Sequence, residues 1–492
     1  MLFESLFTHA RETPQRTAII DERGPCTYSH LAAMAAGLGI YLKVQTGKQS
    51  VGLLLPASAA FAASFYGTLL AGKSAVPMNF LLGDNELAHV IKDSDIDTVV
   101  TIPQLAGRLK DQRLKIIDLT QLPPSPPAVQ PKFPSPRADD LAALIYTSGT
   151  SGLPKGVELT YGNLQSCVDA AIEYASLKGE HRFLGVVPPF HSLGLTATVL
   201  APIQLGAMTV CLGRFSPVAV INAIREHQLS LLFAVPSMYG ALLHLKNASA
   251  EDFRHIYAAI SGGEPLSPTI REKFQQRFGV ELLEGYGLTE TCGPICVNVP
   301  QAKRGGSVGR MLPGASARFV DDDGNMLPQG ATGEIWLKGP MVMKAYHNLP
   351  DETLAVITAD GYFKTGDIGH MDEDGYLYIT GRKKDLIIIA GEKAAPREIE
   401  EALMRHASVA DAAVVGRKDP SRGEVVHAFI VAREGERLDP DALRDHCRRE
   451  NLAQWKIPRD FTILEQLPRS PTGKVLKRVL IDQLDGSSER PE

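Results

Sequence analysis

The sequence predicts an α/β protein, with a large N-terminal part made of several α/β subdomains and a small C-terminal α+β domain. Between about Val51 and Leu283, short β-branched runs alternate with helical patterns, which is typical of a mainly parallel sheet covered by helices. After Arg310 the chain changes to turn-rich strand patterns, and beyond Arg382 a compact mixture of strands and helices follows. The length of 492 residues leaves room for about three units of domain size.

Strands of the N-terminal part are expected at its apolar runs. These are Val51–Leu55, Asp97–Thr101, Ala142–Tyr146, Phe183–Val187, Met208–Leu212, Leu231–Val235 and Ile256–Ile260. Helices are expected between some of them, at Pro217–His227 and Ser267–Phe278. The second helix begins with a serine followed by a proline, which suit the N-cap and the first helical position.

One segment, Val51–Gly72, has no charged residue and is long enough to span a bilayer. Pro56 divides it, Ser58 and Ser64 interrupt it, and alanine dominates the remainder. A buried strand, a turn and a helix packed on a sheet explain this composition better than a membrane span. We therefore expect a soluble protein.

Two changes along the chain indicate its domain organisation. Pro123–Pro136 is a proline-rich, extended connector, and Asp323-Gly324 and Asp374-Gly375 are turn dipeptides in the strand-rich region. We place the domain boundary at Arg382, which gives domains of residues 1–381 and 382–492. The elements expected in the second domain are strands at Leu386–Ile389, Ala412–Val415 and His427–Val431, and helices at Pro396–Arg405 and Pro440–Glu450.

Composition excludes several classes of protein. The formal net charge is −5, with 44% hydrophobic and 22% charged residues, so neither disorder nor a basic nucleic-acid surface is indicated. Six cysteines in so long a chain do not form a disulfide scaffold, and the close pair Cys292 and Cys296 has no partners that would complete a metal site. The stretch MLFESLFTHARETPQR has no cationic start and carries Glu4 among its apolar residues, so we do not expect it to be a signal peptide. We expect a cytoplasmic protein, with peripheral association with a membrane left open.

The strongest local pattern follows the strand at Ala142–Tyr146. It consists of Thr147, Ser148, Gly149, Thr150, Ser151, Gly152, Leu153, Pro154, Lys155 and Gly156. Glycines allow backbone N–H groups to approach phosphate oxygens, hydroxyls donate hydrogen bonds, and a lysine adds charge. Leu153 and Pro154 separate Gly152 from Lys155, so the Walker pattern of P-loop NTPases fails. The residues alone leave open a phosphate-binding loop or an ordinary Gly/Ser turn.

This stretch resembles the phosphate-binding motif of the adenylate-forming superfamily, which includes acyl-CoA synthetases, peptide-synthetase adenylation domains and luciferases. Further motifs of that superfamily follow in the same order. They are Glu284–Thr291 (EGYGLTET), Tyr362–Asp367 (YFKTGD), Gly381–Asp385 (GRKKD), Gly391–Lys393 (GEK), Pro396–Glu400 (PREIE) and Pro471–Lys474 (PTGK). The resemblance covers essentially the whole chain, and it is most specific for the fatty acyl-CoA synthetase branch.

The resemblance implies a two-step reaction in which a carboxylate attacks the α-phosphorus of ATP and a thiol then takes the acyl group. It assigns the loop and Thr289 to the phosphates, Glu290 to Mg²⁺, and Asp367 with Arg382 to the ribose. Lys474 would bridge the substrate carboxylate and the α-phosphate. The remaining nucleotide-binding positions implied are Gly263, Glu264, Gly285, Tyr286 and Gly287. In isolation, Asp367 could be a turn aspartate and Lys474 part of a basic helix start.

A hinge is also implied, because Lys384 matches the superfamily's hinge position. The C-terminal domain would be mobile: one orientation delivers Lys474 for adenylation, and rotation about Lys384 then brings the Gly391 segment to the thiol tunnel. Gly391 would let the pantetheine arm pass close to the backbone. Ala394 is smaller than the apolar residue usually found beside that tunnel. A thiol other than CoA could therefore be the acceptor, and the adenylation step is better supported than the use of CoA.

The class of carboxylic acid substrate is indicated mainly by Phe190 and His191. Amino-acid-activating relatives place an aspartate where this chain has His191, so an amino acid is disfavoured. His191 is expected to border the acyl or thiol channel, with a purely structural histidine as the alternative. Pocket walls are expected at Phe233–Tyr239, Ser261–Glu264 and Gly285–Leu288; the first is apolar and suits a hydrocarbon chain.

We therefore expect a ligase that uses ATP, Mg²⁺ and CoA to activate a medium- or long-chain fatty acid. An aryl-CoA ligase and an acyl–acyl carrier protein synthetase are the alternatives within the same chemistry. The failed Walker pattern argues against an ordinary NTPase. A non-catalytic nucleotide- or lipid-binding protein is disfavoured because the motif residues are intact.

Overall fold

A computed structural model describes residues 2–121, 134–147, 153–469, 475–484 and 486. The chain forms two compact units. The first contains Met1–Gly263, Phe274–Ser316 and Leu337–Phe363, and the second contains Glu264–Lys273, Ala317–Trp336 and Lys364–Glu492. The predicted boundary at Arg382 stays a prediction. The proline-rich connector falls mostly outside the described residues.

The first unit contains two sheets, and the larger one confirms the predicted parallel α/β class. Its described strands run in the order β15-β14-β13-β12-β11-β9-β10-β1-β2, and β13, β12, β11, β9, β10 and β1 are parallel. Their bounds are β1 Thr17–Asp21, β2 Gly24–Thr27, β9 Arg182–Gly185, β10 Met208–Cys211, β11 Leu231–Ala234, β12 Ala258–Ser261, β13 Leu282–Leu288, β14 Gly293–Val297 and β15 Arg310–Met311.

The second sheet runs in the order β18-β8-β7-β4-β3-β5-β6. Its bounds are β3 Ser50–Leu54, β4 Ser74–Pro77, β5 Thr98–Thr101, β6 Lys115–Asp118, β7 Leu141–Thr147, β8 Lys155–Thr160 and β18 Ala345–Tyr346. Strands β7 and β8 are antiparallel, so the chain reverses direction through the glycine-rich segment and continues as a strand. A Walker loop would lead into a helix, so the interpretation that this is not a P-loop is confirmed.

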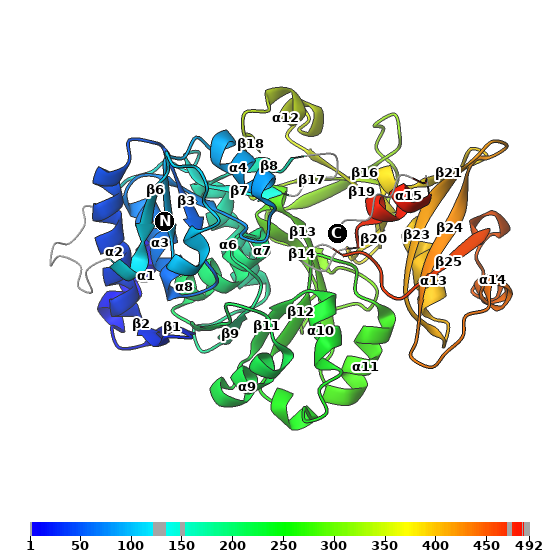
Figure 1. The fold of residues 1–492 in the computed structure, drawn as a ribbon, viewed down its shortest axis with the longest axis horizontal. Helices are drawn as coiled ribbons and strands as arrows, with labels where there is room; N and C mark the ends of the chain where they lie inside the picture. The colour runs from blue at the N-terminus through cyan, green and yellow to red at the C-terminus, as the bar shows by residue number, and fades with distance from the viewer. Residues whose placement is uncertain (1, 122–133, 148–152, 470–474, 485, 487–492) are drawn as a thin grey trace. The chain divides into compact units, whose positions relative to one another are not determined.

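The uncharged segment at Val51–Gly72 forms β3 and α3, as predicted. All twelve residues of α3, Ala59–Leu70, are buried, and Figure 1 shows α3 beside α2, Tyr28–Gln45. Ser58 caps α3 by accepting a hydrogen bond from the Phe61 N–H. No helix within the described ranges is both long and apolar enough to cross a membrane.

The remaining helices through residue 356 have the following bounds: α1 Glu4–Glu12, α4 Asp84–Asp93, α5 Pro103–Ala106, α6 Tyr161–Tyr174, α7 Ser192–Leu195, α8 Ala201–Leu205, α9 Pro217–His227, α10 Pro236–Leu242, α11 Pro268–Phe278 and α12 Pro350–Val356. The predicted bounds of α9 are confirmed, and α11 begins at the predicted Pro268.

The second unit contains a four-stranded sheet among its described residues, in the order β16-β17-β19-β20. Its bounds are β16 Ser316–Val320, β17 Gly333–Lys338, β19 Phe363–Met371 and β20 Leu377–Arg382. The predicted turn glycines Gly324 and Gly375 have φ of 84° and 82°, the left-handed region that these turns require.

The last sheet of the second unit runs in the order β22-β21-β24-β23, with β25 paired to β24. The bounds are β21 Ile387–Ile389, β22 Glu392–Ala394, β23 Val409–Asp419, β24 Gly423–Ala432, β25 Asp460–Leu464, α13 Pro396–Met404, α14 Pro440–Arg449 and α15 Lys477–Leu484. The predicted strands at Ala412–Val415 and His427–Val431 are the buried centres of β23 and β24, which are longer than their apolar runs.

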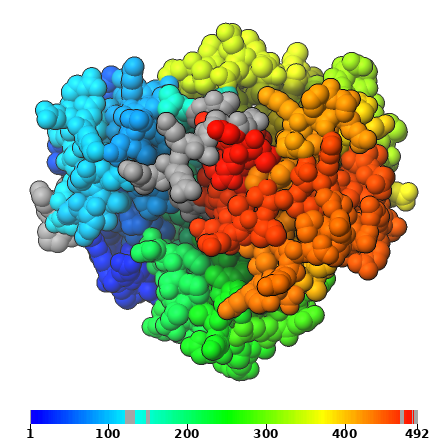
Figure 2. Space-filling view, turned by 45° about the vertical axis from the view of Figure 1, so that its right-hand side comes forward, coloured from blue at the N-terminus to red at the C-terminus, as the bar shows by residue number. Residues whose placement is uncertain are grey.

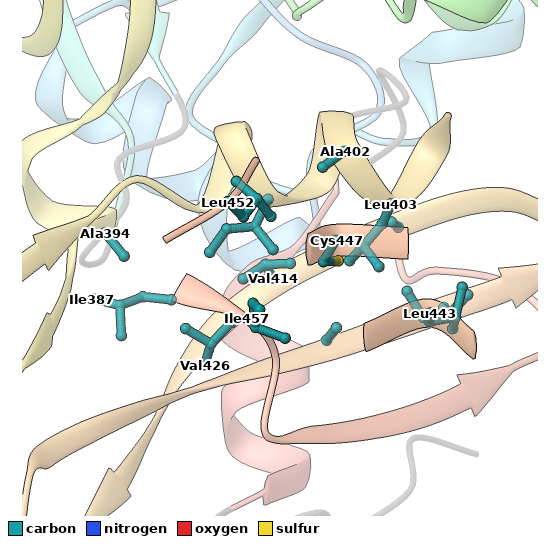
Figure 3. Packing of buried hydrophobic residues seen from close by; sticks show 14 of the residues in the cluster. Ile387, Ala394, Ala402, Leu403, Val414, Val426, Leu443, Cys447, Leu452 and Ile457 are labelled. Carbon is teal, nitrogen blue, oxygen red and sulfur yellow. The ribbon is translucent and has the colours of Figure 1, made fainter. Parts of the chain in front are cut away.

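Helices α13 and α14 cover this sheet over a core that includes Ile387, Val414 and Leu443 (Figure 3). Ala394 is also part of this core and is fully buried. Its small side chain packs in this core, and the effect of its size on the thiol acceptor stays a prediction.

Candidate active site

The phosphate-loop residues lie at the facing ends of β7 and β8. Thr147 ends β7 and is paired in register with Lys155, the first residue of β8; the Thr147 hydroxyl donates to the Lys155 carbonyl at 3.5 Å. The loop residues between them that were singled out, Ser148, Gly149, Thr150, Ser151 and Gly152, lie outside the described residues. The Lys155 ammonium forms an ion pair with Glu352 of α12.

The EGYGLTET motif forms the end of β13 and the turn that follows it. Gly285, Tyr286 and Gly287 lie on β13, and Thr289–Thr291 form a short 3₁₀ turn before β14. A Cβ at position 287 would lie 1.8 Å from the Gly293 carbonyl oxygen, so only glycine permits this close pairing of β13 and β14. The turn is fixed by the Thr291 hydroxyl, which accepts from the Leu288 N–H at 2.9 Å.

Tyr346 lies between the two motifs and contacts both, and no local pattern marks it in the sequence. Its hydroxyl donates to Glu290 Oε1 at 2.7 Å, and Lys155 Nζ lies 5.4 Å from its ring centroid. The Glu290 carbonyl also accepts from the Met343 N–H at 2.7 Å. Burial and the neighbouring Glu290 carboxylate raise the pKa of Tyr346, so this tyrosine stays a hydrogen-bond donor.

A histidine–carboxylate hydrogen bond lies beside Tyr346. His347 Nδ1 is 2.7 Å from Glu158 Oε1, and this contact raises the pKa of His347. The His347 N–H donates to the Gly156 carbonyl at 2.8 Å, next to Lys155. Both contacts fix the two-residue strand β18 against β8. No local pattern marks His347 or Glu158 in the sequence, because their pairing depends on a strand that returns from far along the chain.

In the second unit, Asp367 and Arg382 are confirmed as neighbours. They face each other in register on β19 and β20, and Arg382 Nε donates to Asp367 Oδ1 at 2.9 Å. The Asp367 carboxylate is almost entirely buried, with 4% of its side chain exposed. The charged hydrogen bond from the guanidinium fixes the orientation of the buried carboxylate, as an acceptor for hydroxyl groups requires.

Lys384 is exposed in the 3₁₀ turn Lys383–Asp385, between β20 and β21. Its neighbour Lys383 forms an ion pair with Glu334 at 2.9 Å. Gly391 lies in the two-residue turn between β21 and β22, where Ala390 and Gly391 have φ of 51° and 91°. This turn alone accounts for a glycine at 391. Lys474 lies outside the described residues.

His191 is partly buried, and its ring packs against Phe190 at 4.7 Å between centroids. Its Nε2 atom is shielded from water and has no hydrogen-bond partner among the described residues; the same holds for Ser261 Oγ at the end of β12. Gly263 and Glu264 form the bend that follows β12. Each buried polar atom without a hydrogen-bond partner lowers the stability of the fold unless a ligand forms the missing bond.

Only part of the predicted pocket wall at Phe233–Tyr239 is exposed enough to contact a substrate. Phe233 stacks on Phe183 in the core, and the Tyr239 hydroxyl donates to the Leu232 and Ile260 carbonyls at 3.1 and 3.0 Å. Both side chains are buried. Val235 and Met238 are the partly exposed apolar residues of this segment.

We expect His191 to make the protein sensitive to acid. Burial lowers its pKa to about 4, whereas an unfolded histidine titrates near 6.5. Between these values the unfolded chain binds a proton that the folded chain does not, so stability falls as pH falls. From pH 7 to 4.5 the wild type should lose about 2 kcal/mol more than His191→Gln, as measured by urea unfolding.

The exposed histidine His30 provides the control, since His30→Gln should lose stability in parallel with the wild type. If His191→Gln also loses stability in parallel with the wild type, the ring is accessible to protons in the folded state and this explanation is wrong.

No group of three His, Cys, Asp or Glu side chains within the described ranges is arranged to hold a metal ion. Glu290 therefore offers a single carboxylate. This arrangement fits Mg²⁺ carried by a nucleotide, because that ion commonly takes one or two protein carboxylates and completes its shell with phosphate oxygens and water. All six cysteines are buried, and burial raises the pKa of Cys167 to about 12, which leaves it unsuited as a nucleophile.

Comparison with known proteins places these residues in a wider context. The AMP-binding enzyme family matches residues 6–347, and the AMP-binding enzyme C-terminal domain matches residues 398–474. A sulfoacetate–CoA ligase of Cupriavidus necator is 37% identical, over 93% of this chain and 92% of its own length. A long-chain-fatty-acid–CoA ligase of Bacillus subtilis is 34% identical, over 96% and 93%.

Among solved structures, the o-succinylbenzoate coenzyme A synthetase of Bacillus subtilis in complex with ATP and magnesium ion is 30% identical. The similarity covers 98% of this chain and 99% of that one, with a TM-score of 0.86. The two-part α/β architecture is thus shared over the full length.

Proposed function

This chain belongs to the AMP-binding enzyme family and is an AMP-forming acid–thiol ligase, and from that premise we propose that it converts a medium- or long-chain fatty acid to its CoA thioester. A carboxylate oxygen attacks the α-phosphorus of ATP, and pyrophosphate leaves. The CoA thiolate then attacks the acyl carbon of the adenylate, and AMP leaves.

The observation that carries the nucleotide part of this proposal is the position of Tyr346 between Lys155 and Glu290. A cation for phosphate oxygens and a carboxylate for Mg²⁺ are thereby held together, although they come from different motifs. We assign Thr147, Lys155 and Thr289 to the phosphates. The buried Asp367, oriented by Arg382, is proposed to accept hydrogen bonds from the ribose hydroxyls.

A fatty acid is favoured by the Bacillus subtilis relative named for long-chain fatty acids and by the apolar residues Val235 and Met238. The second candidate is an aromatic or small polar acid. The buried, unpartnered Ser261 Oγ and His191 Nε2 favour it, because a polar acyl group could hydrogen-bond to them. Both relatives carry CoA ligase names, which favours CoA over an acyl carrier protein as the acceptor.

The test is carboxylate-dependent release of pyrophosphate from ATP and Mg²⁺, with and without CoA. Straight-chain fatty acids, aromatic acids and sulfonated or short polar acids form the panel. Release with fatty acids and a fatty acyl-CoA product would support the proposal. Release confined to aromatic or polar acids would establish the second candidate, and adenylate formation without a CoA thioester would point to a carrier protein.

We expect Tyr346→Phe to raise the Mg²⁺ concentration needed for half-maximal pyrophosphate release about tenfold. The reason is that the change removes a hydrogen bond to a carboxylate, worth about 1.5–3 kcal/mol, and frees Glu290 to rotate. A Mg²⁺ titration at fixed ATP measures this. Tyr41→Phe on α2 is the control, and identical titration curves for both variants would show that Tyr346 does not orient Glu290.

A further inference from the structure

The lysine assigned to the ATP phosphates has a carboxylate partner within the chain. Lys155 Nζ forms an ion pair with Glu352, and the side chains remain 31% and 44% exposed. An ion pair with this much exposure is weak and exchangeable. A ligand with several negative charges can therefore reach the lysine and compete with the carboxylate for it.

Glu352 is held near the lysine by the element that carries it. The Tyr346 N–H donates to Thr353 Oγ1 at 2.9 Å, and the Leu349 N–H donates to the Tyr346 carbonyl at 3.2 Å, so α12 is fastened to β18. The stretch that includes α12 lies at the molecular surface (Figure 2, yellow-green), and none of its residues is buried. Glu352 can therefore leave Lys155 by a change of rotamer, without disturbing a packed core.

The surrounding charges make this departure necessary. Lys155, the Tyr346 ring and the Glu290 carboxylate form a contiguous group, and Glu352 adds a second carboxylate to it. A triphosphate approaching Lys155 meets the repulsion of Glu352 at the same time as the attraction of the lysine. AMP has no β- or γ-phosphate and would not meet that repulsion at this position.

We propose, on the basis of the proposed function, that Glu352 is a positioning residue that occupies Lys155 until the β- and γ-phosphates of ATP displace it. It lowers the affinity for ATP and pyrophosphate but not for AMP. The same competition assists release of pyrophosphate after adenylation, because Glu352 returns to the lysine as the product leaves. Lys155 is thus kept in place and charge-balanced between turnovers.

The test is isothermal titration of the full chain with MgATP, Mg-pyrophosphate and AMP, each without an acid substrate. Glu352→Gln should bind MgATP and Mg-pyrophosphate about three- to tenfold more tightly than the wild type, with AMP binding changed less than about twofold. Asp351→Asn removes the same charge one position earlier on α12 and should leave the ratio of ATP to AMP affinity unchanged. In a Lys155→Met background, Glu352→Gln should tighten MgATP binding clearly less than in the wild-type background, because only the repulsion of the phosphates by Glu352 remains to be removed.

Unchanged or weaker ATP binding by Glu352→Gln would overturn the competition. So would equal tightening for ATP and AMP, or the same effect in Asp351→Asn, because each indicates a general charge effect. These results leave the proposed function intact if the wild type binds ATP. Failure of the wild type to bind ATP at all would overturn both proposals.

Discussion

Lys474→Ala is expected to abolish formation of the acyl-adenylate while leaving transfer from a supplied acyl-adenylate largely intact. The proposed role of this lysine is to stabilise the negative charge that develops between the substrate carboxylate and the α-phosphate. Loss of one such donor typically lowers the rate about 10²- to 10³-fold. The second half-reaction makes no use of that charge, so it should keep its rate.

The assay separates the half-reactions by measuring pyrophosphate release and, independently, thioester formation from a synthetic acyl-adenylate and CoA. The matched control is Lys477→Ala, three residues along, because Lys477 is paired with Glu400 at 2.7 Å and has a structural role. Arg469 and Val475, on either side of the motif, form an antiparallel bridge that neither change removes. An equal loss in both half-reactions would contradict the assignment of Lys474 to adenylation.

The second large effect is expected from Lys384→Pro, which should leave adenylation nearly unchanged but slow thioester formation on the order of 10²-fold. Proline fixes φ at position 384 and also restricts Lys383, so the 3₁₀ turn that follows β20 loses its conformational freedom. If the C-terminal domain must reorient at this turn between the half-reactions, the thiol would no longer be placed correctly, and small misplacements are costly.

Lys384→Ala is the control, since it removes the same exposed side chain but keeps the backbone free. It should retain both half-reactions. Thioester formation at the wild-type rate in Lys384→Pro would remove this residue as the hinge. Impairment of Lys384→Ala to the same extent would show that the side chain, and not backbone freedom, matters.

Much of the fold could be predicted because its signals are local. The helix at Pro217–His227 has proline at its first position and an amphipathic pattern, and its predicted bounds are those of α9. The predicted strands of the N-terminal part agree with the observed ones within one or two residues, whereas β23 and β24 extend up to four residues beyond their apolar runs and the buried β4 was not predicted. Strand β25 at Asp460–Leu464 was missed, since its short DFTIL sequence begins with a charged residue and it pairs with β24 from across the domain.

In the candidate site, too, the residues within local motifs were predicted and those brought in by long-range contacts were not. The motif strings identified Lys155, Glu290, Asp367 and Arg382 from the sequence, and the register of β19 and β20 confirms that the last two are neighbours. Nothing local marked Tyr346, which touches Glu290 across 56 residues of sequence.

By itself, the sequence determined the α/β class, the order of the elements and the chemistry of the motifs, because periodicity, capping residues and motif strings act between residues close in the chain. Only the tertiary structure decided that Glu352 faces Lys155, that Tyr346 holds Glu290, and that Ala394 is buried in a core. These contacts follow from how strands pair and helices pack over long separations. A side chain's partner across such a separation depends on the complete arrangement, so no short pattern encodes it.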